Sequence, residues 1–157
     1  FTIKTRGRPP LGTGNRHFTG LSHDDSMPQT SDVDNYRRLI THFREKQQLT
    51  AQRYNSYEYL ECSKETDTLL ISYGALSRIA YYFKNDFALY RPIRMFPIVE
   101  EIKIIASRYK RILIVEMNMG QYAREIERIL HREVEFIPIL GGRIDLKEIK
   151  QKIYGQK

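Results

Sequence analysis

A histidine followed by two carboxylates is the first group in this chain that could do acid–base chemistry. In His23-Asp24-Asp25, a carboxylate beside the imidazole could fix the tautomer of the ring and assist proton transfer. Adjacent side chains rarely point the same way, so a turn capped by an Asp side chain is favoured over a reactive pair. His23 and Asp24 are kept as candidates for the neighbourhood of a pocket, and no residue of the chain is assigned as catalytic.

Two further patterns are too incomplete to indicate catalysis or phosphate binding. Ser77, which follows Gly74 by three residues, lacks the Gly-x-Ser-x-Gly context of a nucleophilic serine, and it is expected to face out of the first turn of a helix. The stretch Gly12-Thr13-Gly14 lacks the third glycine of a phosphate-binding loop and follows no clear strand. A plain turn is therefore favoured there.

The histidines and the single cysteine do not form a metal-binding pattern. The histidines are His17, His23, His42 and His131. Neither a His-Glu-x-x-His motif nor paired cysteines occur. Because Cys62 is the only cysteine, the chain cannot form internal disulfides or hold an iron–sulfur cluster by its own thiolates. We expect no metal site, no cofactor bound by this chain alone, and a reducing cytoplasmic location.

The net charge of +7 and the pI near 9.5 raise the question of nucleic-acid binding. Residues 4–9, Lys-Thr-Arg-Gly-Arg-Pro, resemble a short arm that lays two arginines in an AT-rich minor groove. Such arms usually recur, and this one occurs once. Most charges after residue 55 are mixed in sign along expected helices, as on solvated faces. DNA binding is therefore only an alternative, and no apolar run is long enough to cross a membrane.

The most informative stretch is 112–121, where an apolar strand breaks into a small polar turn and then a helix. Ile112–Val115 is an aliphatic run typical of a parallel strand covered on both faces. The turn at Asn118–Gln121 could present backbone N–H groups to an anion, or it could be a tight strand-to-helix turn that uses Gly120. Arg78 and Arg91, expected near the same sheet edge, could pair with that anion or with a carboxylate of a partner.

The sequence before residue 57 is expected to form an arm and one connecting helix. Residues 1–31 are rich in Gly, Pro, Thr, Ser and Arg, which indicates an extended arm without its own core. Ser31-Asp32 offers a helix start, and the helix is expected to run to about Arg53. Its apolar face consists of Val33, Tyr36, Leu39, Ile40 and Phe43. Such a face requires a partner.

Residues 57–157 are expected to form one α/β domain. A short strand is possible at 57–60, and the expected parallel strands are 68–73, 87–90, 112–115 and 134–139. Helices alternate with these strands. Pro97 is expected to open one helix and Asp145 to cap the last one. Short connections between strands and helices predict a mostly parallel open sheet with helices on both faces.

These motifs resemble the C-terminal part of the alpha subunit of 2-oxoacid:ferredoxin oxidoreductases, the family of 2-oxoglutarate and pyruvate synthases. Residues 19–24, Thr-Gly-Leu-Ser-His-Asp, and the basic helix with Arg37-Arg38 look like the segment that joins two domains in this family. The family's transketolase C-terminal-like domain is matched by Ser72-Tyr73-Gly74, Tyr90-Arg91-Pro92-Ile93, Val115–Gln121 and Gly141-Gly142. The most specific element is the Glu-Met-Asn-Met-Gly-Gln run at 116–121.

The resemblance implies chemistry for a parent enzyme and none for this chain alone. Such enzymes use thiamine diphosphate, Mg²⁺, iron–sulfur clusters and coenzyme A to convert a 2-oxoacid into an acyl-CoA, and they pass the electrons to ferredoxin. The Gly-Asp-Gly motif that holds the magnesium ion is absent here, as are the cluster cysteines. We expect a piece of the alpha subunit, trimmed before Phe1 and inactive alone, whose partners are the beta subunit and the remaining domains.

The resemblance also implies that one edge of the sheet faces the rest of the enzyme. The interface candidates are Gly74, Arg78, Arg91, Asn118, Met119, Gly120 and Gln121. Replacing Gly120 with Val is expected to weaken assembly and to leave the isolated fold mostly intact. His23 and Asp24 lie nearest in sequence to the cofactor domain, so they are the candidates for approach to its pocket. A stand-alone small-ligand site at the sheet edge and the DNA-binding arm remain the alternatives.

Overall fold

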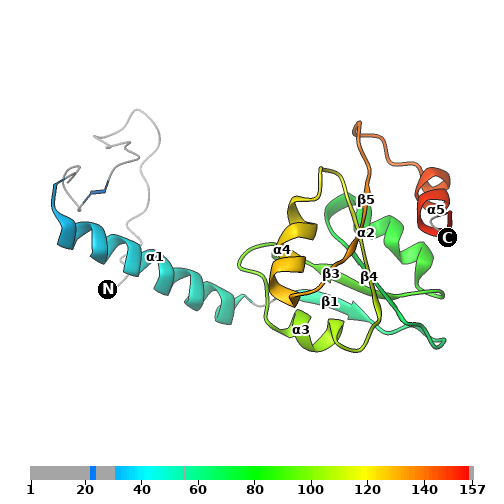
Figure 1. The fold of residues 1–157 in the computed structure, drawn as a ribbon, viewed down its shortest axis with the longest axis horizontal. Coiled ribbons are helices and arrows are strands. Elements are labelled where there is room, and N and C mark those ends of the chain that lie inside the picture. The colour runs from blue at the N-terminus through cyan, green and yellow to red at the C-terminus, as the bar shows by residue number, and fades with distance from the viewer. Residues whose placement is uncertain (1–21, 24–30, 55, 156–157) are drawn as a thin grey trace. The chain divides into compact units, whose positions relative to one another are not determined.

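A computed structural model describes residues 22–23, 31–54 and 56–155 of the chain (Figure 1). The chain divides into two compact units, Phe1–Gln47 and Gln48–Lys157. The long helix α1 (Val33–Arg53) begins in the first unit and ends in the second. The boundary expected between residues 56 and 57 stays a prediction. No helix among the described residues is long and apolar enough to span a bilayer.

Helix α1 starts where the sequence predicts. The Asp32 carboxylate accepts hydrogen bonds from the backbone N–H groups of Asp34 at 3.0 Å and Asn35 at 2.9 Å. A side-chain oxygen in this position satisfies N–H groups that have no partner inside the helix. The helix therefore has a well-defined first turn at Val33.

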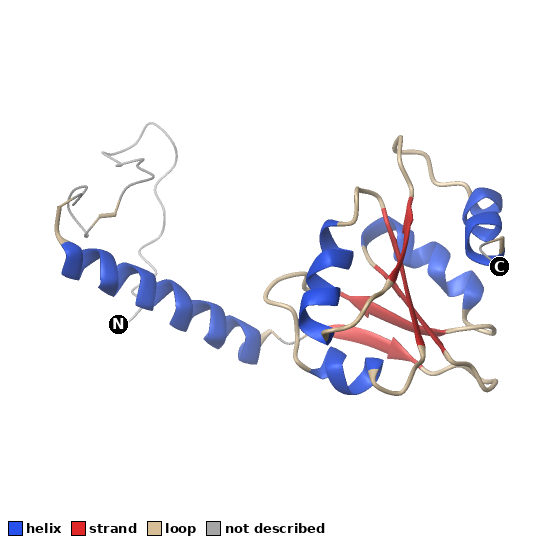
Figure 2. Cartoon of the chain, in the orientation of Figure 1, coloured by secondary structure: helices blue, strands red, loops and turns tan. Residues whose placement is uncertain are grey.

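The second unit contains a five-stranded sheet with helices packed on it (Figure 2). Its elements are β1 (Tyr57–Leu60), β2 (Thr68–Ser72), α2 (Gly74–Ala80), the 3-10 turn η1 (Tyr81–Phe83), β3 (Ala88–Pro92), α3 (Glu101–Ala106), β4 (Arg111–Glu116), α4 (Gln121–Leu130), β5 (Glu135–Pro138) and α5 (Leu146–Tyr154). The strand order is β1-β3-β2-β4-β5. Strands β2 to β5 are parallel, and β1 pairs with β3 in the antiparallel direction. The predicted mostly parallel α/β fold is confirmed.

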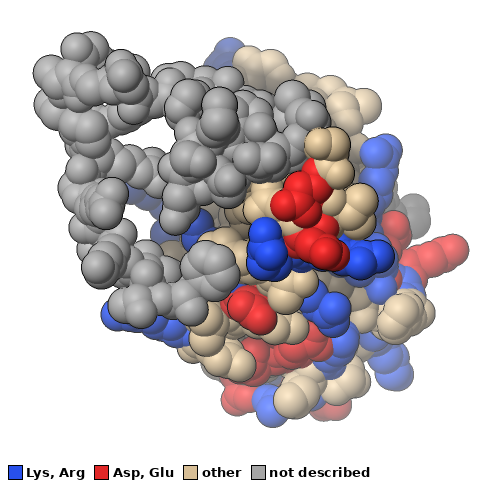
Figure 3. Space-filling model, turned by 90° about the vertical axis from the view of Figure 1, so that its left-hand side faces the viewer, with Lys and Arg blue, Asp and Glu red and all other residues tan. Residues whose placement is uncertain are grey.

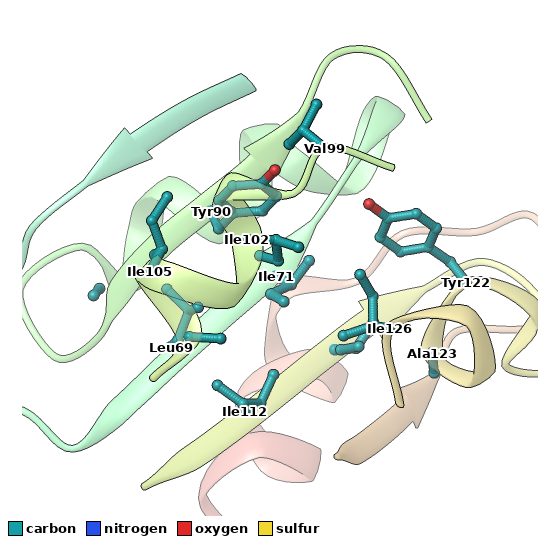
Figure 4. Close-up of a cluster of buried hydrophobic side chains, with 13 residues drawn as sticks. Leu69, Ile71, Tyr90, Val99, Ile102, Ile105, Ile112, Tyr122, Ala123 and Ile126 are labelled. Carbon is teal, nitrogen blue, oxygen red and sulfur yellow. The ribbon is translucent and has the colours of Figure 1, made fainter. Parts of the chain in front are cut away.

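Each face of the sheet carries its own apolar layer because side chains alternate along a strand. Leu69 and Ile71 of β2 point into a layer with residues of α3 and α4, which is drawn in Figure 4. Leu70, between them, points into the opposite layer with residues of α2 and α5. Because both layers cover it, β2 is buried along its whole length. The expectation of helices on both faces is therefore correct.

The loop after β3 differs from the expectation that Pro97 opens a helix. Helix α3 begins only at Glu101. The guanidinium of Arg94 instead donates to the backbone carbonyls of Pro97 at 2.5 Å and Tyr54 at 2.7 Å. Because the Pro97 carbonyl accepts a hydrogen bond from the Arg94 side chain, residues 94–97 form a loop and not the first turn of a helix.

The surface is mixed in charge. On the face shown in Figure 3, Lys and Arg side chains lie among Asp and Glu side chains over the described residues. Some ion pairs lie within one helix, such as Arg128 with Glu125 at 2.9 Å in α4 and Lys152 with Glu148 at 2.7 Å in α5. This is the pattern of solvated faces that the sequence indicates for the second unit.

Candidate interface at the carboxyl edge of the sheet

The ends of β2 and β4 form the point where the direction of winding changes in this sheet. These strands are neighbours, yet α2, which follows β2, packs on one face, and α4, which follows β4, packs on the other. In open α/β sheets such a point leaves a crevice outside the carboxyl ends of the strands, where ligands usually bind. The residues at and directly after the carboxyl ends of β2 and β4 are therefore the ones that would line such a crevice.

A buried carboxylate lies in this position. Glu116, the last residue of β4, is only 1% exposed. Its carboxylate accepts hydrogen bonds from the backbone N–H groups of Tyr122 and Ala123, each at 3.2 Å. These N–H groups belong to the first turn of α4, where the helix dipole favours a negative charge. The Tyr73 hydroxyl donates a third hydrogen bond to Glu116 at 2.7 Å.

The turn between β4 and α4 satisfies its own polar groups. The Asn118 side-chain oxygen accepts from the N–H groups of Gly120 at 2.9 Å and Gln121 at 3.3 Å. The Gln121 side-chain oxygen accepts from the N–H group of Met119 at 2.9 Å. Together with the Glu116 contacts, every backbone N–H group from residue 119 to 123 has an acceptor. The hypothesis that this turn offers N–H groups to an anion is therefore wrong, and the tight-turn interpretation is correct.

Tyr73 connects the two strand ends through its hydroxyl group. Besides donating to Glu116, its hydroxyl accepts a hydrogen bond from the Asn118 amide at 2.9 Å. Burial, followed by the hydrogen bond to Glu116 and the charge of that carboxylate, raises the pKa of Tyr73 to about 12. The Tyr73 ring packs edge-on against Tyr122, with centroids 5.2 Å apart. Tyr73 thus links the end of β2 to Glu116 at the end of β4 and to Asn118 in the turn that follows β4.

Gly120 is required by the fold itself. Its φ of +89° lies in the left-handed region, and a Cβ atom there would come within 3.3 Å of the Phe136 ring. A Val at this position would strain the turn and displace Phe136. The expectation that Gly120→Val leaves the isolated fold mostly intact is therefore not supported by this geometry.

Two methionines are the exposed apolar groups of the same turn. Met117 is 40% exposed and Met119 is 61% exposed. The β4–β5 ladder continues beyond the strands through a 3.0 Å hydrogen bond from the Ile139 N–H group to the Glu116 carbonyl. Leu140, also exposed, follows Ile139 and so leaves the neighbouring strand end. The carboxyl edge at β4 and β5 therefore presents flexible apolar side chains on a rigid turn.

The other interface candidates are Gly74 after β2, Arg78 on α2 and Arg91 near the end of β3. Gly74 begins α2 with a φ of +57°. Arg78 is exposed on α2. Arg91 of β3 donates to the Glu58 carboxylate of β1 at 3.0 Å, and the Tyr81 hydroxyl donates to the same carboxylate at 3.1 Å. The strand order brings these residues to the edge that also carries Asn118–Gln121, and their role in binding stays a prediction.

The remaining candidates separate in the structure. Ser77 is buried, and its hydroxyl donates to the Gly74 carbonyl at 2.7 Å, so the expectation that it faces outward is wrong. His23 is exposed and lies in the first unit, whereas Asp24 and the arm at residues 4–9 lie outside the described residues. Within the described part of the chain, no group of three or more potential ligands could hold a metal ion.

The sequence interpretation did not single out Glu116 or Tyr73 as structural centres of this edge. A signal for Glu116 was present, because an acid directly after the apolar run Ile112–Val115 and before a helix is placed to cap that helix. No comparable local signal identified Tyr73. Its partner is 43 residues away in sequence, and the contact depends on the pairing of Ser72 with Val115.

No family model matches the chain. Comparison with curated proteins finds similarity to subunits of 2-oxoglutarate synthase. The chain is 33% identical over 152 residues to the 2-oxoglutarate synthase subunit KorA of Methanothermobacter thermautotrophicus, with 89% of this chain and 40% of that subunit covered. It is also 33% identical over 163 residues to KorA of Methanothermobacter marburgensis, with 95% of this chain and 43% of that subunit covered. KorA of Methanocaldococcus jannaschii is 26% identical over 166 residues, which cover 94% of this chain and 42% of the subunit. The chain thus spans about two fifths of the length of these curated relatives.

A solved structure shares the fold. It is a 2-oxoglutarate:ferredoxin oxidoreductase from Magnetococcus marinus with 2-oxoglutarate, coenzyme A and succinyl-CoA bound. The match has a TM-score of 0.70 at 17% identity, and it covers 94% of this chain and 27% of that chain. The fold defines the class as an α/β domain of the kind found in 2-oxoacid:ferredoxin oxidoreductases. Within this class, the chain is related to part of the KorA subunit of 2-oxoglutarate synthase, and the predicted resemblance to the alpha subunit is confirmed.

Proposed function

We propose that this chain is an assembly domain of the alpha subunit of a 2-oxoacid:ferredoxin oxidoreductase. The similarity to KorA supports the kind of enzyme, and the relatives' name favours 2-oxoglutarate as the 2-oxoacid. In this proposal the parent enzyme decarboxylates the 2-oxoacid oxidatively, forms an acyl-CoA and passes electrons to ferredoxin. The beta subunit and the remaining domains of the oxidoreductase are the partners.

The role of the chain in this proposal is to present the carboxyl edge of its sheet to the rest of the enzyme. The observation that carries it is the exposure of Met117 and Met119 on a turn whose polar groups are already satisfied. Methionine side chains adapt to irregular apolar surfaces, and methionine is enriched at protein interfaces. A rigid turn with exposed thioethers is suited to contact with protein and offers little to a polar ligand.

The start of α4 does not fit the diphosphate of a cofactor. The N–H groups at the start of α4 are bonded to Glu116 and Asn118, so they cannot hold a diphosphate. The buried Glu116 carboxylate would also repel an anion at this place. No chemical step is therefore assigned to the described part of the chain, and thiamine diphosphate, Mg²⁺, the iron–sulfur cluster and coenzyme A are assigned to the partners.

The test is co-expression of this chain with the remaining alpha-subunit domains and the beta subunit of its source. Met119→Asp places a charge in the proposed interface and should abolish co-purification and 2-oxoacid-dependent viologen reduction. Ile104→Asp is the matched control, because Ile104 is 64% exposed on α3 and not at this edge. If the wild-type chain recovers no thiamine-containing partner, the proposed function is wrong. If Met119→Asp assembles like the wild type, the assignment of this edge is wrong.

A further inference from the structure

Helix α1 carries an apolar seam that nothing in the described part of the chain covers. Val33, Tyr36, Ile40 and Phe43 follow one another at spacings of three, four and three residues. Each of these side chains is between 45% and 60% exposed. Spacings of three and four, with the half-buried Leu39 beside Ile40, place these side chains on one face by which a helix can pack along another helix. The pattern therefore provides one apolar surface for packing against another element.

The exposed seam is costly for an unpaired helix. Over its 21 residues, α1 has one buried residue among those described, Asn35. Most helical stability in proteins comes from packing of an apolar face and not from helix propensity. Two exposed aromatic rings, Tyr36 and Phe43, add apolar surface that monomeric proteins usually bury. Packing of the seam against another helix would provide the missing stabilisation.

The residues beside the seam indicate the charge of the partner. If Val33 and Ile40 are placed at position a, Arg37 and Arg44 occupy position e, and Lys46 occupies position g. No Asp or Glu lies at these flanking positions within the helix. A second copy of α1 would bring further basic flanks and no carboxylates to pair with them. An acidic helix, in contrast, would place Glu or Asp opposite all three cations.

We propose that α1 docks an amphipathic helix of a partner protein whose seam is apolar and whose flanking positions are acidic. Phe43 and Tyr36 are the apolar anchors, and Arg37, Arg44 and Lys46 select the partner by charge. The surface lies on the first unit, whereas the carboxyl edge belongs to the second. The inference therefore does not depend on the oxidoreductase assignment.

The test measures binding of the full chain to a synthetic four-heptad helix that has Leu at positions a and d and Glu at positions e and g. A second helix with Lys in place of Glu, which has the same apolar positions and the opposite charge, is the control. Fluorescence anisotropy should show binding of the Glu helix only, with an affinity that falls as salt is added. Phe43→Ala should weaken this binding about tenfold. Ile104→Ala, which removes an exposed apolar side chain from α3, should leave it unchanged.

A charge reversal gives the sharpest outcome. The double variant Arg37→Glu, Arg44→Glu should bind the Lys helix and reject the Glu helix, whereas Arg38→Glu, on the opposite side of α1, should keep the original preference. Circular dichroism of each variant checks that the fold is retained. Equal binding of both helices, or no binding of the Glu helix, would overturn the proposal. Self-association of the wild type that Phe43→Ala abolishes would also overturn it, since the occupant would then be a second copy.

Discussion

The Tyr73 hydroxyl donates a 2.7 Å hydrogen bond to the buried Glu116 carboxylate and so joins the ends of β2 and β4. The same carboxylate caps the first turn of α4 through two backbone N–H groups. One acidic side chain thus holds a strand end, a helix start and a neighbouring loop. Side chains of the protein itself are thus hydrogen-bonded to one another at the edge where many α/β sheets bind a ligand.

Glu116→Gln should destabilise the second unit. The amide is uncharged, and its single oxygen cannot replace the two carboxylate oxygens that accept from Tyr73 and the helix N–H groups. Loss of charge-assisted hydrogen bonds in a buried place should lower the free energy of unfolding by about 2 kcal/mol, measured by urea denaturation. Glu125→Gln, on the exposed side of α4, is the control and should change it by less than about 0.5 kcal/mol. Equal effects of the two variants would mean that Glu116 has no special role.

The raised pKa of Tyr73 predicts a loss of stability in alkali. The unfolded chain releases this proton near the ordinary tyrosine pKa of 10.0, and the folded chain retains it until about 12. The stabilisation of the folded state by protonated Tyr73 is therefore complete below pH 10, and it is lost as the pH rises through 12. Tyr73→Phe should flatten the fall by up to about 1 kcal/mol per pH unit, a value reduced for partial solvent exposure. Urea denaturation at pH 8 and pH 11 measures this, with Tyr82→Phe, at an exposed site, as the control. If Tyr73→Phe left the pH dependence of the unfolding free energy unchanged, Tyr73 would not be the group responsible for the loss of stability in alkali.

Gly120→Ala should cost more than Gly74→Ala. Both glycines have a positive φ, so each substitution carries a left-handed strain of about 1 to 2 kcal/mol. A Cβ atom at residue 120 would also meet the Phe136 ring at 3.3 Å, whereas one at residue 74 would meet nothing within 4 Å. Thermal unfolding should therefore rank Gly120→Ala as the less stable variant. Adding Phe136→Leu to Gly120→Ala should recover part of the difference, and failure to do so would exclude the steric explanation.

Tyr90→Phe should leave the fold as stable as the wild type or up to about 1 kcal/mol more stable. The Tyr90 hydroxyl is buried without a hydrogen-bond partner among the described residues. Figure 4 shows its ring at the same end of the apolar layer as Tyr122 and Val99. Removing an unsatisfied buried polar group relieves its desolvation cost. A loss of more than about 1 kcal/mol in urea denaturation would show that the hydroxyl has a bonded partner, such as an ordered water.

The parts of the fold that depend on local sequence could be predicted well. The start of α1 at Asp32 and the cap of α5 at Asp145 follow from side chains that bond the backbone a few residues away. The buried strands follow from short apolar runs. The predicted start of α3 at Pro97 was wrong. Arg94 donates a hydrogen bond to the Pro97 carbonyl, and the spacing of apolar residues does not predict such a contact. The hydrogen bond between Tyr73 and Glu116 was not predicted for a similar reason. The two residues are far apart in sequence, and they meet only through the register of the sheet.

The antiparallel direction of β1 has a consequence for how partners are held. Tyr57, the first residue of β1, pairs with Pro92, the last residue of β3, so the chain that leaves α1 enters the sheet at its carboxyl edge. The helix seam and the carboxyl edge that carries Met117 and Met119 thus belong to one chain, whose first unit continues into its second at Gln48. A partner assembly that engages both surfaces binds the second one at a high effective concentration, so two individually weak contacts give an avidity that neither has alone.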